Sequence, residues 1–190
     1  MHRLTTFATA CILAAMAAAC ASPPSQFYTL NSTATLATTG SVVSVAVGPV
    51  VVPAVVDCPQ IVLTMGANQL RVDEFNRWAS PLAENITQVV IADLVRELGT
   101  ARVWAQAQTA LAKPDFQVTV DVQRFDSVLG EAVEIDALWT VRAAAGGATR
   151  SGRSQVRELA AGAGFAPLVA AHSRALARVS GDIATAIRAP

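Results

Sequence analysis

Two stretches of the chain alternate between apolar and mostly polar side chains, and they restrict the possible folds more than any other feature. Apolar residues occupy every second position over residues 116–122, and again over residues 133–141. A period of two puts successive side chains of a β-strand on opposite faces of a sheet. The chain is therefore predicted to contain a sheet with one buried and one solvated face, which is typical of antiparallel strands.

Two other segments predict amphipathic helices that cover the buried face of this sheet. The first is expected over residues 81–98, where apolar side chains recur every fourth position, with Ser80 as the N-cap and Gly99 as the C-terminal stop. A similar apolar stripe predicts the second helix over residues 167–187. Gly181 is unfavourable inside that helix, since a glycine there costs about 1 kcal/mol.

Shorter β-prone runs complete the sheet, at residues 27–30, 43–52, 61–65, 69–72, 102–104 and 149–156. The Gly66-Ala67-Asn68 turn predicts a hairpin, Gly48-Pro49 predicts a break in its strand, and the last run is expected at an edge. Polar residues of the first helix, Asn85 and Asp93 among them, fall outside its apolar stripe. These elements predict a single-domain α+β fold, in which two amphipathic helices pack on a mixed, mainly antiparallel sheet.

The first twenty residues predict export and a lipid anchor. A short basic start is followed by small apolar residues over 7–19, a stretch that is too short to span a bilayer and has the length of a signal-peptide core. The sequence Ala17-Ala18-Ala19-Cys20 resembles a bacterial lipobox. That resemblance implies cleavage between Ala19 and Cys20, a diacylglycerol on the thiol and an acyl chain on the new amino group. An ordinary signal peptidase site is the alternative.

The chain is accordingly divided into three parts. Residues 1–19 are the expected lipoprotein signal peptide, residues 20–40 the lipidated cysteine with a flexible tether, and residues 41–190 the periplasmic domain. No segment from Ala21 onward has the length and polarity of a transmembrane helix. Because Ala21 and not an aspartate follows the cysteine, similarity to enteric sorting signals implies the outer membrane.

Composition excludes several classes of function. The 190 residues include 14 basic and 14 acidic side chains and are 53% hydrophobic, which argues against a nucleic-acid-binding protein and against a disordered chain. After signal cleavage His172 is the remaining histidine and Cys58 the remaining unmodified cysteine, so neither a His-rich metal site nor an internal disulfide can form. His172 is expected to be solvated or packed in its helix. We predict no catalytic residue, no metal and no cofactor, apart from the N-acyl diacylglycerol on Cys20.

Five short motifs then occur in a characteristic order: Phe27-Tyr28-Thr29-Leu30, Val45-Ala46-Val47-Gly48-Pro49-Val50, Gln60-Ile61-Val62, Arg77-Trp78-x-x-Pro81-Leu82, and a stretch from Phe165 to Ser173. Together they resemble the PqiC-type family, the auxiliary lipoproteins of ABC-type and MCE-type transport systems. The motif that begins with Arg77-Trp78 is the most specific of the five. The resemblance covers nearly all of the chain after Cys20.

The resemblance implies a non-enzymatic protein on the periplasmic face of the outer membrane. Such a protein docks onto an MCE-type protein that works with an inner-membrane permease and ATPase, and the complex moves phospholipids between the membranes and supports membrane integrity. A homo-oligomeric ring is the expected form. Two alternatives remain: an assembly lipoprotein that partners an outer-membrane β-barrel, or a secreted hydrolase built on acidic clusters such as Glu134 and Asp136.

Four aromatic or basic residues are candidates for a partner interface: Phe27, Tyr28, Arg77 and Trp78. Tryptophan and arginine are enriched where binding energy is concentrated. The alternative for Trp78, which we favour, is that it packs over the start of the first helix as part of the core. Phe27 and Tyr28 form either an added edge strand or a docking peptide.

Overall fold

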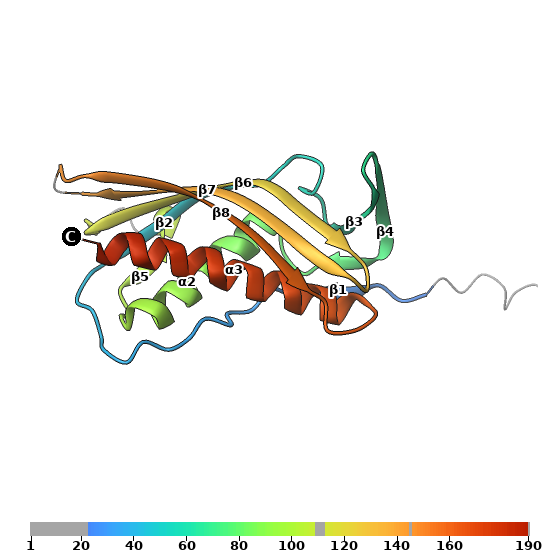
Figure 1. The fold of residues 1–190 in the computed structure, drawn as a ribbon, viewed down its shortest axis with the longest axis horizontal. Coiled ribbons are helices and arrows are strands. Elements are labelled where there is room, and N and C mark those ends of the chain that lie inside the picture. The colour runs from blue at the N-terminus through green and yellow to red at the C-terminus, as the bar shows by residue number, and fades with distance from the viewer. Residues whose placement is uncertain (1–22, 109–112, 145, 190) are drawn as a thin grey trace, which may run out of the picture.

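The computed structural model describes residues 23–108, 113–144 and 146–189 (Figure 1). Its helices are α2 (Leu82–Leu98) and α3 (Phe165–Arg188), with a short 3-10 turn at Gln106–Gln108. Its strands are β1 (Gln26–Tyr28), β2 (Val45–Val51), β3 (Gln60–Gly66), β4 (Gln69–Trp78), β5 (Val103–Ala105), β6 (Phe116–Val128), β7 (Ala132–Ala143) and β8 (Thr149–Leu159). In the described part of the chain, no helix is both long enough and apolar enough to cross a membrane.

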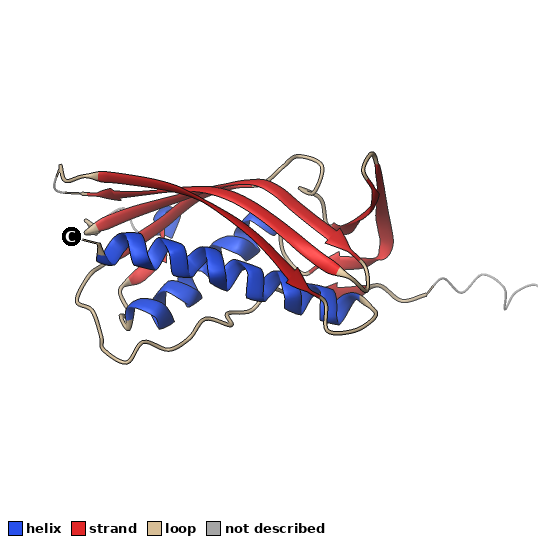
Figure 2. Ribbon diagram, viewed as in Figure 1, coloured by secondary structure: helices blue, strands red, loops and turns tan. Residues whose placement is uncertain are grey.

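The strands form two mixed sheets, and both helices pack on one face of the larger sheet (Figure 2). The larger sheet has the order β5-β2-β6-β7-β8, with β6, β7 and β8 antiparallel and β2 parallel to both β5 and β6. The smaller sheet has the order β1-β4-β3, in which β3 and β4 are the predicted hairpin and β1 runs parallel to β4. The predicted α+β single-domain fold is confirmed, although the strands divide between two sheets rather than one.

The core lies between the larger sheet and the two helices. The predicted stripe of α2 is buried throughout, and it consists of Leu82, Ile86, Val90, Leu94 and Leu98. The stripe of α3 is buried in the same way, and it consists of Leu168, Leu176, Val179, Ile183 and Ile187. The apolar positions of the two alternating strands meet these stripes from the sheet. Each such side chain stabilises the fold by about 1.5–3 kcal/mol when it is fully removed from water.

The two ends of α2 differ from each other in how well the sequence predicts them. Gly99 ends the helix with a left-handed backbone (φ 62°), as expected of a C-terminal glycine. The N-cap is Pro81 and not Ser80, and no side chain caps the first turn. The prediction for Ser80 is therefore wrong, because the helix begins one residue later and the extended Pro81 takes the position before it.

The segment over residues 29–37, which we call the N-terminal strap, packs across both helices. Leu30 and Ala34 of the strap are buried. The strap backbone is bonded to α2 through Ala37 N to Arg96 O (2.8 Å) and Arg96 Nε to Ala34 O (2.7 Å). The predicted flexible tether over residues 20–40 is thus wrong for residues 26–37, because β1 pairs with β4 and the strap backbone is hydrogen-bonded to α2. The folded domain begins at β1.

The strap also explains why two polar residues of α2 are buried. Asn85 accepts a hydrogen bond from the backbone N–H of Leu30 (3.2 Å). Asp93 accepts bonds from the backbone N–H of Ala34 (3.4 Å) and from the hydroxyl of Ser180 on α3 (3.1 Å). Both side chains lie outside the apolar stripe of α2, as predicted, but the strap covers them and uses them as acceptors.

Candidate functional site

The lipid is expected on Cys20 and cleavage between Ala19 and Cys20, and both residues lie outside the described ranges, so cleavage and lipidation remain predictions. The described chain begins at Pro23 and enters the fold at β1, at one end of the elongated domain (Figure 1). A membrane anchor on Cys20 would therefore hold the domain by that end.

The pairing of β1 with β4 brings all four candidate interface residues together. Phe27 lies beside Arg77, and Tyr28 lies beside Trp78. The hydroxyl of Tyr28 donates to Oδ1 of Asn76 (3.0 Å). Phe27 and Tyr28 therefore form an added strand of the smaller sheet, which was one of the two predicted alternatives.

The four side chains differ in their access to solvent. Phe27 is 64% exposed, whereas Trp78 is only 5% exposed. The indole of Trp78 packs edge-on against the rings of Phe125 and His172, at centroid distances of 6.2 and 6.3 Å. Trp78 takes the core role given above as its alternative and is not available as a surface anchor in this conformation. Arg77 is half-buried, and its Nε donates to the carbonyl of Glu74 (3.2 Å).

His172 is packed in the core and cannot act as a catalytic base on a substrate. Its ring stacks on Phe125 with centroids 4.0 Å apart and planes 4° apart. Its Nε2 lies 2.7 Å from the hydroxyl of Ser127, while its Nδ1 has no hydrogen-bond partner among the described residues. Burial lowers the pKa of His172 to about 3, so the imidazole is neutral at physiological pH. Of the two expected states of His172, solvated or packed, the structure shows the packed one.

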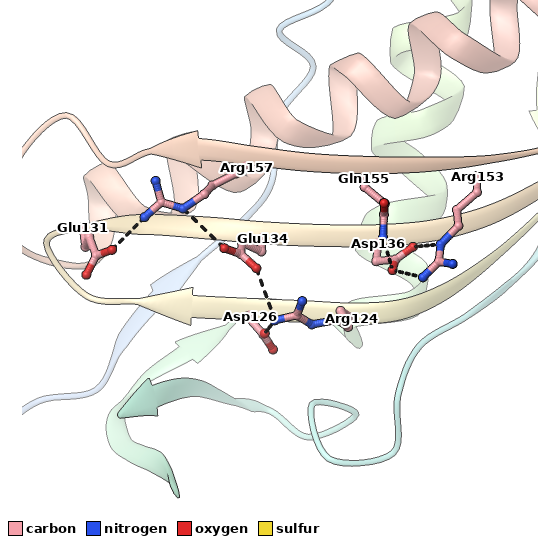
Figure 3. Close-up of polar contacts among 8 residues, drawn as sticks. All are labelled: Arg124, Asp126, Glu131, Glu134, Asp136, Arg153, Gln155 and Arg157. Atoms are coloured by element: carbon pink, nitrogen blue, oxygen red, sulfur yellow. Dashed lines mark hydrogen bonds and ion pairs between the residues drawn. The ribbon is translucent and has the colours of Figure 1, made fainter. Parts of the chain in front are cut away.

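The acidic clusters lie on the outer face of the larger sheet, where arginines pair with them (Figure 3). The pairs are Arg124 with Asp126 and Glu134, Arg157 with Glu131 and Glu134, and Arg153 with Asp136. Both oxygens of Asp136 bind Arg153, at 2.8 and 2.5 Å, and Gln155 adds a third bond. These bonds lower the pKa of Asp136 to about 2. A general acid needs a raised pKa, so Asp136 does not suit that role in a glycoside hydrolase.

A groove of about 1030 Å³ lies between the strap, α2 and the end of β2. Its walls are mainly small apolar side chains and neutral polar groups, and Glu84 is the one charged side chain among the described residues that line it. Binding of a phosphate group needs cationic or backbone donors. The groove therefore suits an apolar or neutral segment better than a lipid headgroup. No cluster of metal-ligating side chains occurs within the described ranges.

Comparison with known families decides which class of protein this is. The family model for the ABC-type transport auxiliary lipoprotein component matches residues 28–184, from β1 to the last turns of α3. The chain belongs to this family. The family resemblance inferred from the motifs is confirmed, and the match covers the smaller sheet, the strap, the larger sheet and both helices of this auxiliary lipoprotein.

Solved structures share the fold of this auxiliary lipoprotein at low sequence identity. It resembles the crystal structure of an uncharacterized protein with a TM-score of 0.71 and 21% identity, over 87% of this chain and 99% of that one. It also resembles protein XCC0632 from Xanthomonas campestris with a TM-score of 0.70 and 18% identity, over 84% of this chain and 93% of that one. No curated protein matches the chain.

Proposed function

We propose that this auxiliary lipoprotein is the outer-membrane-anchored, non-enzymatic subunit of an MCE-type ABC transport system that moves phospholipids between the two membranes. The family match over residues 28–184 is the observation that carries the proposal. A lipid on Cys20 would place the protein on the periplasmic face of the outer membrane. Transport of this kind would support membrane integrity.

The chemistry of the described residues agrees with a non-enzymatic role. His172 is sealed in the core, and Asp136 is held in a bidentate ion pair on the sheet. The energy for transport would come from a separate inner-membrane ATPase and permease. This protein would supply a rigid domain, an anchor and a docking surface for the MCE-type protein, and a homo-oligomeric ring would surround the end of that partner.

Docking would use the exposed side of β4, where Arg77 offers a partly exposed guanidinium. Arginine is enriched among the residues that carry most of the binding energy of protein interfaces.

Co-purification tests the proposal. The full-length protein with a C-terminal tag is extracted in mild detergent, and its partners are identified by mass spectrometry. We expect an MCE-type protein together with a permease and an ATPase. Recovery of an outer-membrane β-barrel, or of no partner from a well-solubilised sample, would overturn the transport role and leave the family and fold standing.

A single variant tests the docking surface. Arg77→Ala is expected to lose most of the co-purified MCE-type protein while its melting temperature stays unchanged, because the side chain is partly exposed. Leu138→Ala is the matched control, since Leu138 is 42% exposed on β7, on the outer face of the larger sheet. Equal recovery from both variants would show that docking uses another surface.

A further inference from the structure

We propose that one end of the domain rests in the interfacial region of the membrane that holds Cys20. This anchor end consists of β1, the turn between β6 and β7, and the C-terminal end of β8. The inference rests on the proposed lipidation of Cys20, and it adds that the domain itself touches lipid. It follows from three observations: the short chain before β1, the elements that gather there, and the apolar side chains that they expose.

The chain between the anchor and the fold is short because β1 is part of a sheet. Gln26 pairs with Asn76 and follows Cys20 by six positions. Six residues span at most about 20 Å at full extension, whereas the twenty residues of the predicted tether would have spanned about 70 Å. The residue that begins β1 can therefore never lie further than about 20 Å from the lipidated cysteine.

Two contacts join β1 to the start of α3, and the end of β8 to the β6–β7 turn, at this end of the molecule (Figure 1). The ring of Tyr28 in β1 lies 6.0 Å from the ring of Phe165, which begins α3. The backbone N–H of Ala160 bonds to the carbonyl of Glu131 (2.9 Å), which joins the end of β8 to the β6–β7 turn. The β3–β4 hairpin stands at the same end of the molecule, where the N-terminal chain leaves (Figure 1).

The elements of the anchor end expose large apolar side chains to solvent. Phe27 and Leu159 are each 64% exposed, and Leu129 in the β6–β7 turn is 37% exposed. Peripheral proteins insert phenylalanine and leucine a few ångströms into the boundary between headgroups and acyl chains. A cluster of such side chains in water would favour association. Because the tether keeps the start of β1 within about 20 Å of the lipid, the bilayer is the partner that this end of the domain meets first.

The far end of the domain provides the comparison. Val42 is 85% exposed there, and the neighbouring Ser41 N–H bonds to the carbonyl of Leu98 at the C-terminal end of α2 (2.9 Å). Since α2 begins near the anchor end and is 17 residues long, its two ends lie about 25 Å apart. Val42 is equally apolar but is carried away from the membrane.

Site-specific fluorescence tests the contact on the lipidated mature protein. In a Cys58→Ser background, Phe27→Cys, Leu159→Cys and Val42→Cys each receive a nitrobenzoxadiazole label, while the Cys20 thiol is blocked by its lipid. The protein is reconstituted into vesicles of phosphatidylethanolamine and phosphatidylglycerol. We expect blue-shifted emission at positions 27 and 159 that a nitroxide-bearing phospholipid quenches strongly. The label at position 42 should show neither effect.

Flotation of the vesicles and an intact mass separate this inference from the proposed anchor. A protein that carries the acyl mass and floats, but whose labels at 27 and 159 behave like the label at 42, overturns the membrane contact and leaves lipidation standing. Blue-shifted emission without quenching by the lipid probe also overturns it, because the label is then buried against protein. If the protein lacks the acyl mass and does not float, both the proposed lipid anchor and the membrane contact are overturned.

Discussion

The buried imidazole of His172 makes the stability of the domain depend on pH. Burial lowers the pKa of His172 from its ordinary value of 6.5 to about 3. Between these values the unfolded chain binds a proton that the folded state does not. We therefore expect stability to fall as the pH drops below 6.5, by at most about 1.4 kcal/mol per pH unit for this group, in urea unfolding at pH 7, 6 and 5.

Two carboxylates modify that profile in opposite directions. Burial raises the pKa of Asp93, although hydrogen bonds from Ser32, Ser180 and the strap backbone oppose the shift. Acidification toward that raised pKa therefore offsets part of the loss. Asp136, whose pKa is held near 2, contributes stability that is lost only below its ordinary value of 3.8. A stability that stays constant between pH 7 and 5 in a D93N background would contradict the assignment to His172.

Removing one or both members of the His172–Ser127 pair gives a second prediction at the residue scale. H172F keeps a ring that can stack on Phe125, but it leaves the Ser127 hydroxyl in the core without the imidazole. We expect it to lower the free energy of unfolding at pH 7 by about 1–3 kcal/mol. S127A/H172F removes both polar groups and should recover most of that loss, and it should lack the slope between pH 6.5 and 5. Calorimetry at pH 7 and at pH 5 would show both the recovered stability and the missing pH dependence.

At the scale of elements, the strap depends on polar side chains of α2. Asn85→Ala removes the acceptor of the Leu30 N–H and should cost about 1–3 kcal/mol of stability. The amide of Leu30 should then exchange its hydrogen faster, by a factor that matches the loss. Thr87→Ala is the matched control, because its hydroxyl bonds to Ala83 of the same helix (2.7 Å) and not to the strap. Unchanged exchange at Leu30 in N85A would mean that the strap is held by other contacts.

The pairing of β7 with β8 depends on a glycine. A Cβ on Gly152 would lie 2.2 Å from Cζ2 of Trp139, whose indole N–H donates to Ser154 (3.0 Å). Gly152→Ala must displace that indole, and we expect it to lower stability by about 1–3 kcal/mol. Gly66→Ala places its methyl group in open space and should change stability by less than about 0.5 kcal/mol. Thermal unfolding of the two variants would decide, and equal melting temperatures would contradict the close packing.

The sequence predicts those elements whose pattern is local and repeated. The stripe of α2 and the alternation of β6 and β7 each repeat over several periods, and all three elements are found where they were expected. The strap is not predictable in this way, because Leu30 and Ala34 bond to residues 55 and 59 positions away in a stretch without periodicity. The parallel pairing of the three-residue strand β1 with β4 is equally non-local.

The candidate site is predictable only in part, for a related reason. The residue type alone does not tell whether a tryptophan before a helix packs in the core or faces a partner. The role of Trp78 is decided by its contacts with Phe125 and His172, which are distant in sequence. The proximity of Phe27 to Arg77 also depends on the strand pairing. The family, by contrast, could be inferred from the motifs, because both the motifs and their order along the chain are read directly from the sequence.

At the scale of the whole molecule, the proposed ring makes a prediction about mass. A ring needs a head-to-tail interface, in which one surface of a copy contacts a different surface of the next, and closure gives a single defined number of copies. Native mass spectrometry of the full-length protein in detergent should therefore show one oligomer larger than a dimer. A monomer across the accessible concentration range would contradict the ring, and a ladder of increasing masses would indicate an open chain instead.

The direction of β1 has a mechanical consequence for a protein tied to a moving surface. Tension from the proposed anchor would pull on the N-terminal end of β1, while its neighbour β4 is held at the opposite end, where the chain turns into α2. The backbone hydrogen bonds between the two strands are therefore loaded together in shear and not opened one after another. The strap comes next along the chain, and its backbone is held by hydrogen bonds to Asn85 and Asp93. Force from a membrane anchor would thus be distributed over the β1–β4 hydrogen bonds before it reached the helices.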